Sequence, residues 1–135
     1  MNDSQAKFAQ LAAPPVFIVG AARSGTTWVH DIFQAHPDVA TAYETFLFTQ
    51  NGLGSFFSQT HSSPHHGIGR LFEEGELTEY IRQIAIDILS KVIEPQHHYL
   101  VEKSPNHIES VDIIRQIFPT AKFIHLVRDG RDVYI

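Results

Sequence analysis

Several common features are missing from this sequence. It has no cysteine, which excludes a disulfide framework and a thiolate metal site. No run approaches the roughly 18 apolar residues of a membrane-spanning helix, and the polar start lacks the apolar core of a signal peptide. These absences predict a cytoplasmic protein without a membrane span.

An excess of positive charge is also missing. The formal net charge is −5, from 10 basic and 15 acidic residues. A chain of this charge is not expected to bind nucleic acid or anionic membranes non-specifically. The 135 residues, of which 43% are hydrophobic and 19% charged, suit one globular domain. Any anionic ligand must be bound by local groups.

A phosphate-binding loop is present, but its lysine is absent. In VGAARSGTTWV, Gly20 and Gly25 have the spacing of the motif G-x-x-x-x-G-K-[ST], and Thr26 stands where the lysine belongs. Such glycine pairs occur by chance, so the context decides. The apolar run Val16–Gly20 predicts a buried strand before the loop, and a helical pattern follows it. A plain strand-to-helix turn remains the alternative.

The rest of the chain alternates in the same way. Apolar runs predict strands over 16–20, 39–43, 98–103 and 122–127, and helical periodicity predicts helices after the loop, from 77 to 92 and from 104 to 118. This alternation predicts an α/β fold, a P-loop-like parallel sheet flanked by helices.

The domain organisation follows from the same patterns. Residues 1–13 are predicted to form a loose leader and 14–135 the domain, with a variable insertion over 45–76 that is rich in Gly, Ser and His. The last residues begin a helix that one turn cannot stabilise alone. We therefore expect a fragment of a larger domain, which as a truncated chain is expected to be inactive or reduced in activity.

Polar side chains in the loop predict an anion site. Backbone N–H groups at a helix start favour an anion, Arg23 adds a bidentate donor, and Ser24, Thr26 and Thr27 add hydroxyls. Lys103 ends one predicted strand and Arg128 follows another. Because ligands bind beyond the carboxyl ends of parallel strands, we expect these side chains to converge, although each alone is typical of a solvated surface charge.

The missing lysine bears on the kind of anion. A Mg²⁺-dependent triphosphatase needs that lysine at the γ-phosphate. A sulfuryl group carries less charge, so its transfer requires less neutralisation and no metal. The loop therefore suits a phosphosulfate better than a triphosphate. A kinase or triphosphatase with an altered loop, and a nucleotide-binding module without catalysis, stay open as alternatives.

Three segments together resemble a known family. FIVGAARSGTTWV resembles the 5′-phosphosulfate loop of sulfotransferases that use 3′-phosphoadenosine 5′-phosphosulfate (PAPS). FIHLVRDGRDV resembles their 3′-phosphate-binding strand and turn, and VEKSPNH resembles the segment with their central lysine. The stretch AHPDVATAYET adds a likeness to the tyrosylprotein-type and related bacterial members.

The resemblance implies roles for individual residues. Glu44 would be the general base, and Lys103 would stabilise charge on the sulfuryl group and leaving phosphate. Arg128 would bind the 3′-phosphate, and the 5′-phosphosulfate would be held by a loop set: Arg23, Ser24, Gly25, Thr26 and Thr27. The family's further serine would fall at position 136, one past the last residue.

Four other features each allow two interpretations. His107 lies near, but out of register with, the catalytic histidine of cytosolic sulfotransferases, and is a second candidate base. Trp28 could stack on a ligand or pack on the sheet. Arg131 could reach the 3′-phosphate or cap its own turn. The histidines at 61, 65 and 66 could bind a metal, but their spacing favours a loop.

The sequence thus predicts a PAPS-dependent sulfotransferase without a metal. Its acceptor is expected to be a hydroxyl or amine on a small molecule or peptide. The identity of that acceptor cannot be derived, because acceptor sites lie in variable loops.

Overall fold

The computed structural model describes residues 1–133. The strands are Val16–Gly20 (β1), Val39–Tyr43 (β2), Tyr99–Lys103 (β3) and Lys122–Leu126 (β4). The α-helices are Asp3–Ala9 (α1), Thr26–Gln34 (α2), Leu53–His61 (α3), Glu76–Leu89 (α4), Val111–Ile117 (α5) and Gly130–Val133 (α6). Three 3-10 helices cover Gly67–Leu71 (η1), Ser90–Val92 (η2) and Pro105–Ser110 (η3).

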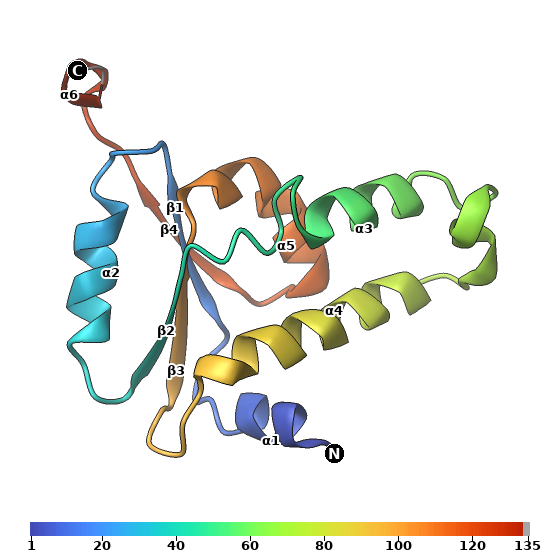
Figure 1. The fold of residues 1–135 in the computed structure, drawn as a ribbon, viewed down its shortest axis with the longest axis horizontal. Coiled ribbons are helices and arrows are strands. Elements are labelled where there is room, and N and C mark those ends of the chain that lie inside the picture. The colour runs from blue at the N-terminus through green and yellow to red at the C-terminus, as the bar shows by residue number, and fades with distance from the viewer. Residues whose placement is uncertain (134–135) are drawn as a thin grey trace.

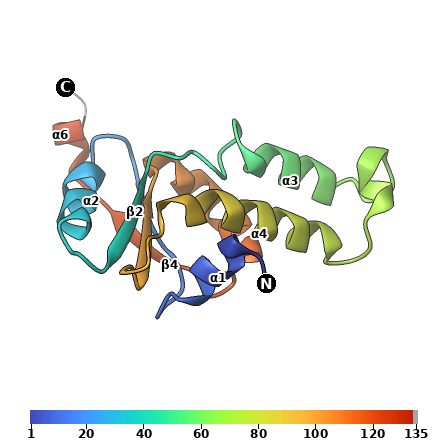
Figure 2. The same ribbon diagram turned by 60° about the horizontal axis from the view of Figure 1, so that its bottom comes forward.

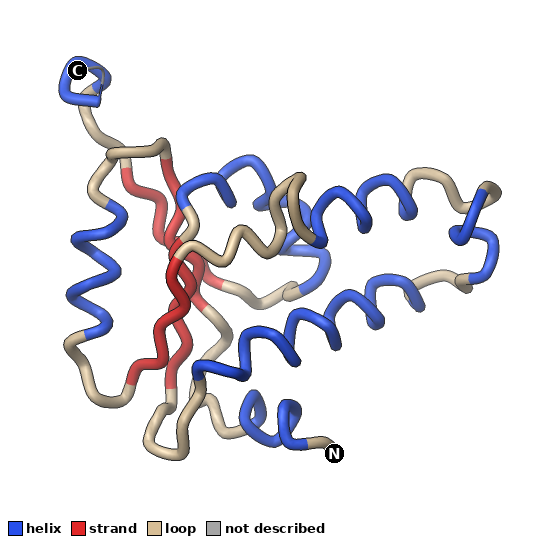
Figure 3. The backbone as a smooth tube through the Cα atoms, in the orientation of Figure 1, coloured by secondary structure: helices blue, strands red, loops and turns tan. Residues whose placement is uncertain are grey.

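The four strands form one parallel sheet in the order β2-β3-β1-β4. Helix α2 covers one face, and α4 and α5 lie on the other (Figures 1 and 3). All carboxyl ends point to the edge at the top of Figure 1, where the loop after β1 and the turn before α6 lie. The predicted α/β architecture is confirmed.

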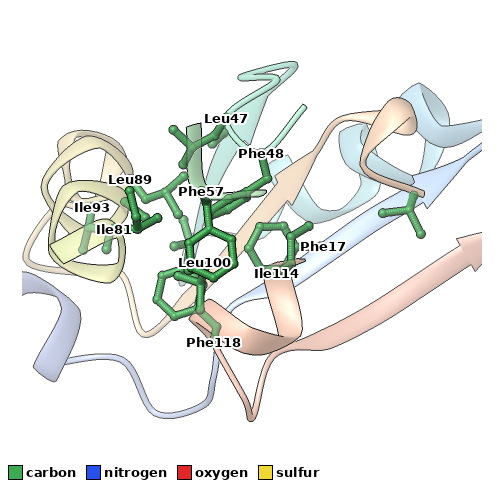
Figure 4. Packing of buried hydrophobic residues seen from close by; sticks show 14 of the residues in the cluster. Phe17, Leu47, Phe48, Phe57, Ile81, Leu89, Ile93, Leu100, Ile114 and Phe118 are labelled. Carbon is green, nitrogen blue, oxygen red and sulfur yellow. The ribbon is translucent and has the colours of Figure 1, made fainter. Parts of the chain in front are cut away.

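The core lies between the sheet and the helices α4 and α5. Phe17 of β1 is fully buried, and its ring lies 6.0 Å from that of Phe48 and 6.3 Å from that of Phe118 (Figure 4). Neighbouring Ile18, also fully buried, points to the opposite face because side chains alternate along a strand. Burial on both faces explains why β1 is a continuous apolar run.

The predicted loose leader contains a helix. Asn2 caps α1 by accepting from the backbone N–H of Gln5, and the Gln5 side chain returns the bond, which is a capping box. Phe8 stacks on Phe118 at 5.9 Å, and Gln5 bonds to Gln83 of α4. These contacts with the core stabilise a helix too short to persist by itself.

The predicted insertion is also more ordered than its composition suggested. It holds α3 and η1, and together with α4 it forms an arm that projects away from the sheet (Figure 2). Its first part belongs to the core, because Leu47, Phe48 and Phe57 are buried in the same cluster. Because Gly, Ser and His residues interrupt these apolar positions, the sequence shows no helical or strand period here, and the buried residues could not be recognised from it.

One predicted helix begins differently. The sequence pattern predicts an α-helix that begins at residue 104. The chain instead forms η3 first and enters the α-helix only at Val111. The Ser104 hydroxyl donates to Glu102 in the protein interior, so the strand before it, rather than the helix after it, uses this side chain.

Candidate functional site

The loop between β1 and α2 is shaped by two glycines. A Cβ on Gly20 would lie 2.6 Å from the Leu126 carbonyl oxygen of β4, so only glycine allows the strands to approach so closely here. Gly25 has a φ of 100° and precedes the first turn of α2. The N–H groups of that turn have no intrahelical partner, which makes the helix start suited to an anion.

This loop opens into a cavity of about 660 Å³ at the carboxyl edge of the sheet. Four separate segments line it. The cationic, hydroxyl and acidic side chains are those of Arg23, Thr26, Thr27, Asp31, Glu44, Lys103 and Arg128, and the other lining residues are Ala22, Gly25, Trp28 and Pro105. The predicted convergence of Arg23, Lys103 and Arg128 therefore occurs in the structure.

Lys103 lies at the centre of this arrangement. Its side chain is almost fully buried, and its ammonium donates to Glu44 Oε1 at 2.6 Å and to Thr27 Oγ1 at 2.9 Å. The Tyr43 ring lies 4.4 Å from the same nitrogen, a favourable cation–π distance. A P-loop would carry its lysine at position 26, where this chain has Thr26. Here Lys103 of β3 supplies an ammonium next to that position, at Thr27.

Glu44 follows β2 directly. Its backbone N–H donates to the Lys103 carbonyl at 2.6 Å, and its φ of 47° is left-handed. Arg23 (φ 65°) and Phe46 (φ 51°) share this conformation, which costs a residue with a Cβ on the order of 1–3 kcal/mol and is concentrated at functional sites. The side chain of Glu44 is 35% exposed, so a ligand in the cavity can reach it.

The remaining loop residues divide into two groups. Thr26 and Arg23 line the cavity, whereas the Ser24 hydroxyl donates to the Ala21 carbonyl at 2.6 Å and braces the loop itself. Arg128 donates to the Arg23 carbonyl at 3.3 Å. The turn after β4 is thereby linked to the loop after β1.

The structure distinguishes between the two interpretations of Trp28 and between those of Arg131. Trp28 is 71% exposed and lines the cavity, so it does not pack against the sheet. Arg131 donates its guanidinium hydrogen bonds to Asp129, which lowers the pKa of that carboxyl below its ordinary value. Arg131 is therefore engaged in its own turn.

His107 is not placed as a base, and the histidine-rich segment forms no metal cluster within residues 1–133. His107 is fully buried and bonded to Glu102 and to the Phe48 N–H, so it cannot reach an acceptor in the cavity as a base. Within residues 1–133, no three histidine or carboxylate side chains gather closely enough to hold a metal. The His61 ring instead stacks on Phe57 at 5.2 Å.

A second cavity, of about 680 Å³, lies beside the first. Amide and hydroxyl side chains dominate its lining, among them Gln50, Asn51, Ser55 and Asn106. Pro105 lines the first cavity and Asn106 the second, so η3 separates the two.

The sequence profile described as the sulfotransferase family matches residues 14–135. The chain belongs to the sulfotransferase family. The resemblance drawn from its three motifs is confirmed.

Several relatives within this family are protein-tyrosine sulfotransferases. Protein-tyrosine sulfotransferase 1 of Danio rerio is 36% identical over 122 residues, which cover 87% of this chain and 33% of that protein. The human enzyme of the same name is 33% identical over 123 residues, and the Drosophila melanogaster enzyme is 34% identical over 122. The chain spans a third or less of the length of these relatives.

These sulfotransferases correct the expected location. The animal tyrosylprotein enzymes are Golgi membrane enzymes, so the prediction of a cytoplasmic protein is wrong. That prediction rested on the absence of a signal-peptide pattern and of a long apolar run from the given sequence, and such absences do not determine the compartment. Within residues 1–133, none of the helices has the length and apolar character to cross a membrane.

Two parts of the candidate site were not predicted from the sequence. Asp31 lines the cavity one helical turn after Thr27, and its i+4 spacing was a usable signal. The buried contacts of the segment after Glu44 with Glu102, Ser104 and His107 could not be predicted, because these residues reach that segment only through the strand order.

Proposed function

We propose that this protein transfers a sulfuryl group from PAPS to an acceptor hydroxyl or amine. The observation that carries the proposal is the position of the Lys103 ammonium, which joins the Glu44 carboxylate to the Thr27 hydroxyl of the phosphate-type loop. An acid, a cation and an anion-binding helix start meet in one cavity. This is the combination that sulfuryl transfer to a hydroxyl requires.

The residues present fit the two anionic ends of PAPS. The 5′-phosphosulfate is assigned to Arg23, Thr26, Thr27 and the N–H groups from Gly25 onward, with Ser24 bracing the loop. Arg128, on the neighbouring turn, is assigned to the 3′-phosphate. Charge-assisted and bidentate hydrogen bonds from arginine are strong, which offsets the net negative charge of the chain.

The chemistry uses Glu44 and Lys103. Glu44 accepts the proton of the acceptor hydroxyl as its oxygen attacks sulfur. The new S–O bond forms while the bond from sulfur to the 5′-phosphate oxygen breaks, and the electron pair leaves with 3′-phosphoadenosine 5′-phosphate. An ammonium has three donors, and Lys103 directs two of them at Glu44 and Thr27. It can therefore stabilise the departing oxygen with little rearrangement.

A peptide is the proposed acceptor class. The names of the relatives state that they act on protein tyrosine. The second cavity adds support, since amide and hydroxyl side chains such as those of Gln50 and Asn106 can pair with the main chain of an extended peptide. A tyrosine-bearing peptide is therefore the first acceptor to assay.

The first experiment is a thermal-shift titration with 3′-phosphoadenosine 5′-phosphate, compared with 5′-AMP and Mg-ATP. A ligand that binds only the folded state raises the unfolding midpoint, by the equivalent of about 2.7 kcal/mol at a hundredfold excess over Kd. We expect the bisphosphate alone to stabilise the protein. Stabilisation by Mg-ATP only would favour a kinase, and no shift with any ligand would contradict the assigned site.

Replacing Arg23 tests the loop directly. Arg23→Ala should remove charge-assisted hydrogen bonds worth about 1.5–3 kcal/mol, which corresponds to roughly ten- to a hundredfold in affinity for the bisphosphate. Calorimetric titration measures the loss. Arg115→Ala, which removes an exposed arginine of α5, is the matched control. Equal affinity of the two variants would show that the loop is not the donor site.

A further inference from the structure

Four consecutive backbone N–H groups after Glu44 are bound by side chains of one network rather than by a strand or helix. Thr45 donates to Glu102 Oε1 at 3.3 Å, Phe46 to Ser104 Oγ at 3.1 Å, Leu47 to Thr45 Oγ1 at 3.2 Å, and Phe48 to His107 Nε2 at 3.0 Å. Irregular backbone that enters a core needs such partners, because unpaired buried N–H groups are costly. These contacts fix the path of residues 45–48.

The carboxylate of Glu102 is the centre of this network. It accepts from the hydroxyls of Ser104 at 2.5 Å and Thr45 at 2.8 Å, and from His107 Nδ1 at 3.0 Å. Glu102, Ser104 and His107 are each no more than 1% exposed. A buried carboxylate is tolerated only when its oxygens are satisfied, and here both of them are.

The hydrogen bonds also define the state of His107. Because Nε2 accepts from the Phe48 N–H, that nitrogen carries no proton, and the proton on Nδ1 is donated to Glu102. His107 is thus a neutral imidazole whose two nitrogens are both in use. It connects the carboxylate to the far end of the segment.

The network and the cavity meet at the end of β3. Glu102 and Lys103 are neighbours on this strand and point to opposite faces. On the chain that passes the strand end, Glu44 bonds to Lys103 and Thr45 bonds to Glu102. The position of the Glu44 carboxylate therefore depends on the anchoring of Thr45, one residue away, and the network holds the left-handed backbone on either side.

We propose that Glu102 and His107 are positioning residues that hold Glu44 in place for proton transfer. This inference rests on the proposed sulfuryl transfer. Neither side chain touches the cavity, so each acts through the segment 45–48. Their effect should appear in the turnover of bound substrate, and not in the affinity for the donor.

The variant Glu102→Gln tests the proposal while keeping the shape of the side chain. Both carboxylate oxygens of Glu102 accept hydrogen bonds, and an amide has only one oxygen, so its NH2 must face either the proton on His107 Nδ1 or the donors of Thr45, and one of these anchors is lost. We expect kcat to fall by about a hundredfold, the usual effect of a misplacement near 1 Å, with an unchanged Kd for 3′-phosphoadenosine 5′-phosphate. Ile117→Val, a change in the fully buried core, controls for lower stability and should leave kcat intact.

A double-mutant cycle separates positioning from general weakening of the fold. If Glu102 acts through Glu44, Glu102→Gln should cost little further activity in a protein that already carries Glu44→Gln, since the effects of residues that work as a unit are not additive. If the fall in kcat of the double variant equalled the product of the falls in the two single variants, the proposal would be overturned. Should Glu102→Gln fail to fold, the pair Thr45→Val and Thr45→Ser replaces it, because only serine keeps the hydroxyl.

Amide hydrogen exchange tests the network without any activity. In Glu102→Gln, or in Thr45→Val, the amides of residues 45–48 should exchange at least tenfold faster, whereas those of α4 should not change. Unchanged exchange would overturn the anchoring. A full-length protein that transfers no sulfuryl group would refute the proposed function and with it the role for Glu44, even if exchange showed the anchoring itself to be real.

Discussion

Glu44→Gln should abolish most turnover while leaving the donor bound. A general base contributes about 10²–10⁴-fold to a rate, and the amide cannot accept the proton of the acceptor. The Glu44 carboxylate also faces the cavity that is assigned to an anion, so its neutralisation removes a repulsion. We therefore expect kcat to fall by about 10²–10⁴, with equal or tighter binding of 3′-phosphoadenosine 5′-phosphate.

The measurement is a transfer assay run beside calorimetric titration of the bisphosphate. Glu74→Gln, which neutralises an exposed carboxylate on the distant arm, should match the wild-type protein in both. A near-wild-type rate for Glu44→Gln would remove the base role from this residue. Since His107 is buried with both nitrogens engaged, the proton would then have to go to another group that lines the cavity, such as Asp31.

Lys103→Met should also lower kcat strongly. Unlike Glu44→Gln, it should weaken the binding of 3′-phosphoadenosine 5′-phosphate. Methionine keeps a long, unbranched side chain at this buried position but removes the ammonium. Losing one group that stabilises the charge of the transition state costs about 10²–10³ in kcat. The Glu44 carboxylate, no longer paired at 2.6 Å, is left facing the donor. Affinity for the bisphosphate should therefore fall, in contrast to Glu44→Gln.

Two further variants make the Lys103 result interpretable. Lys91→Met removes an exposed lysine and should change neither kcat nor affinity. The double variant Lys103→Met with Glu44→Gln removes both charges, so binding should recover relative to Lys103→Met while turnover stays low. Failure of binding to recover would show that Lys103 contacts the donor directly in the ground state.

The sequence was sufficient to predict those features that depend on local patterns of apolar, glycine and charged residues. The apolar runs of β1 and β3 and the glycine spacing of the loop predicted the parallel sheet and the position of the loop at its carboxyl edge. Lys103 and Arg128 were predicted to meet because each lies at the carboxyl end of a strand, and the carboxyl ends of parallel strands share one edge of the sheet. These features depend on neighbours in sequence and on a general rule of topology.

The rest depends on strand order, which no local pattern encodes. Glu44 and Lys103 are 59 residues apart and meet because β3 lies between β2 and β1. The same order creates the network around Glu102, which joins residues 45–48 to residues 102–107. Helix α1 had a visible capping box in Asn2 and Gln5, but its stability comes from contact with α4, which composition alone does not reveal.

The alternation of Glu102 and Lys103 has a consequence for how the sheet assembles. A shift of β3 by one residue would exchange the two side chains between faces. The ammonium would then enter a core prepared for a carboxylate, beside His107, while the carboxylate would face the anion-binding loop. Each misplaced charge would be buried without its partner, at a cost of several kcal/mol. The two charges assigned to the proposed chemistry and to its support therefore also disfavour a wrong alignment of the strand, and a molecule with the wrong register would be unstable and would lack the proposed donor site.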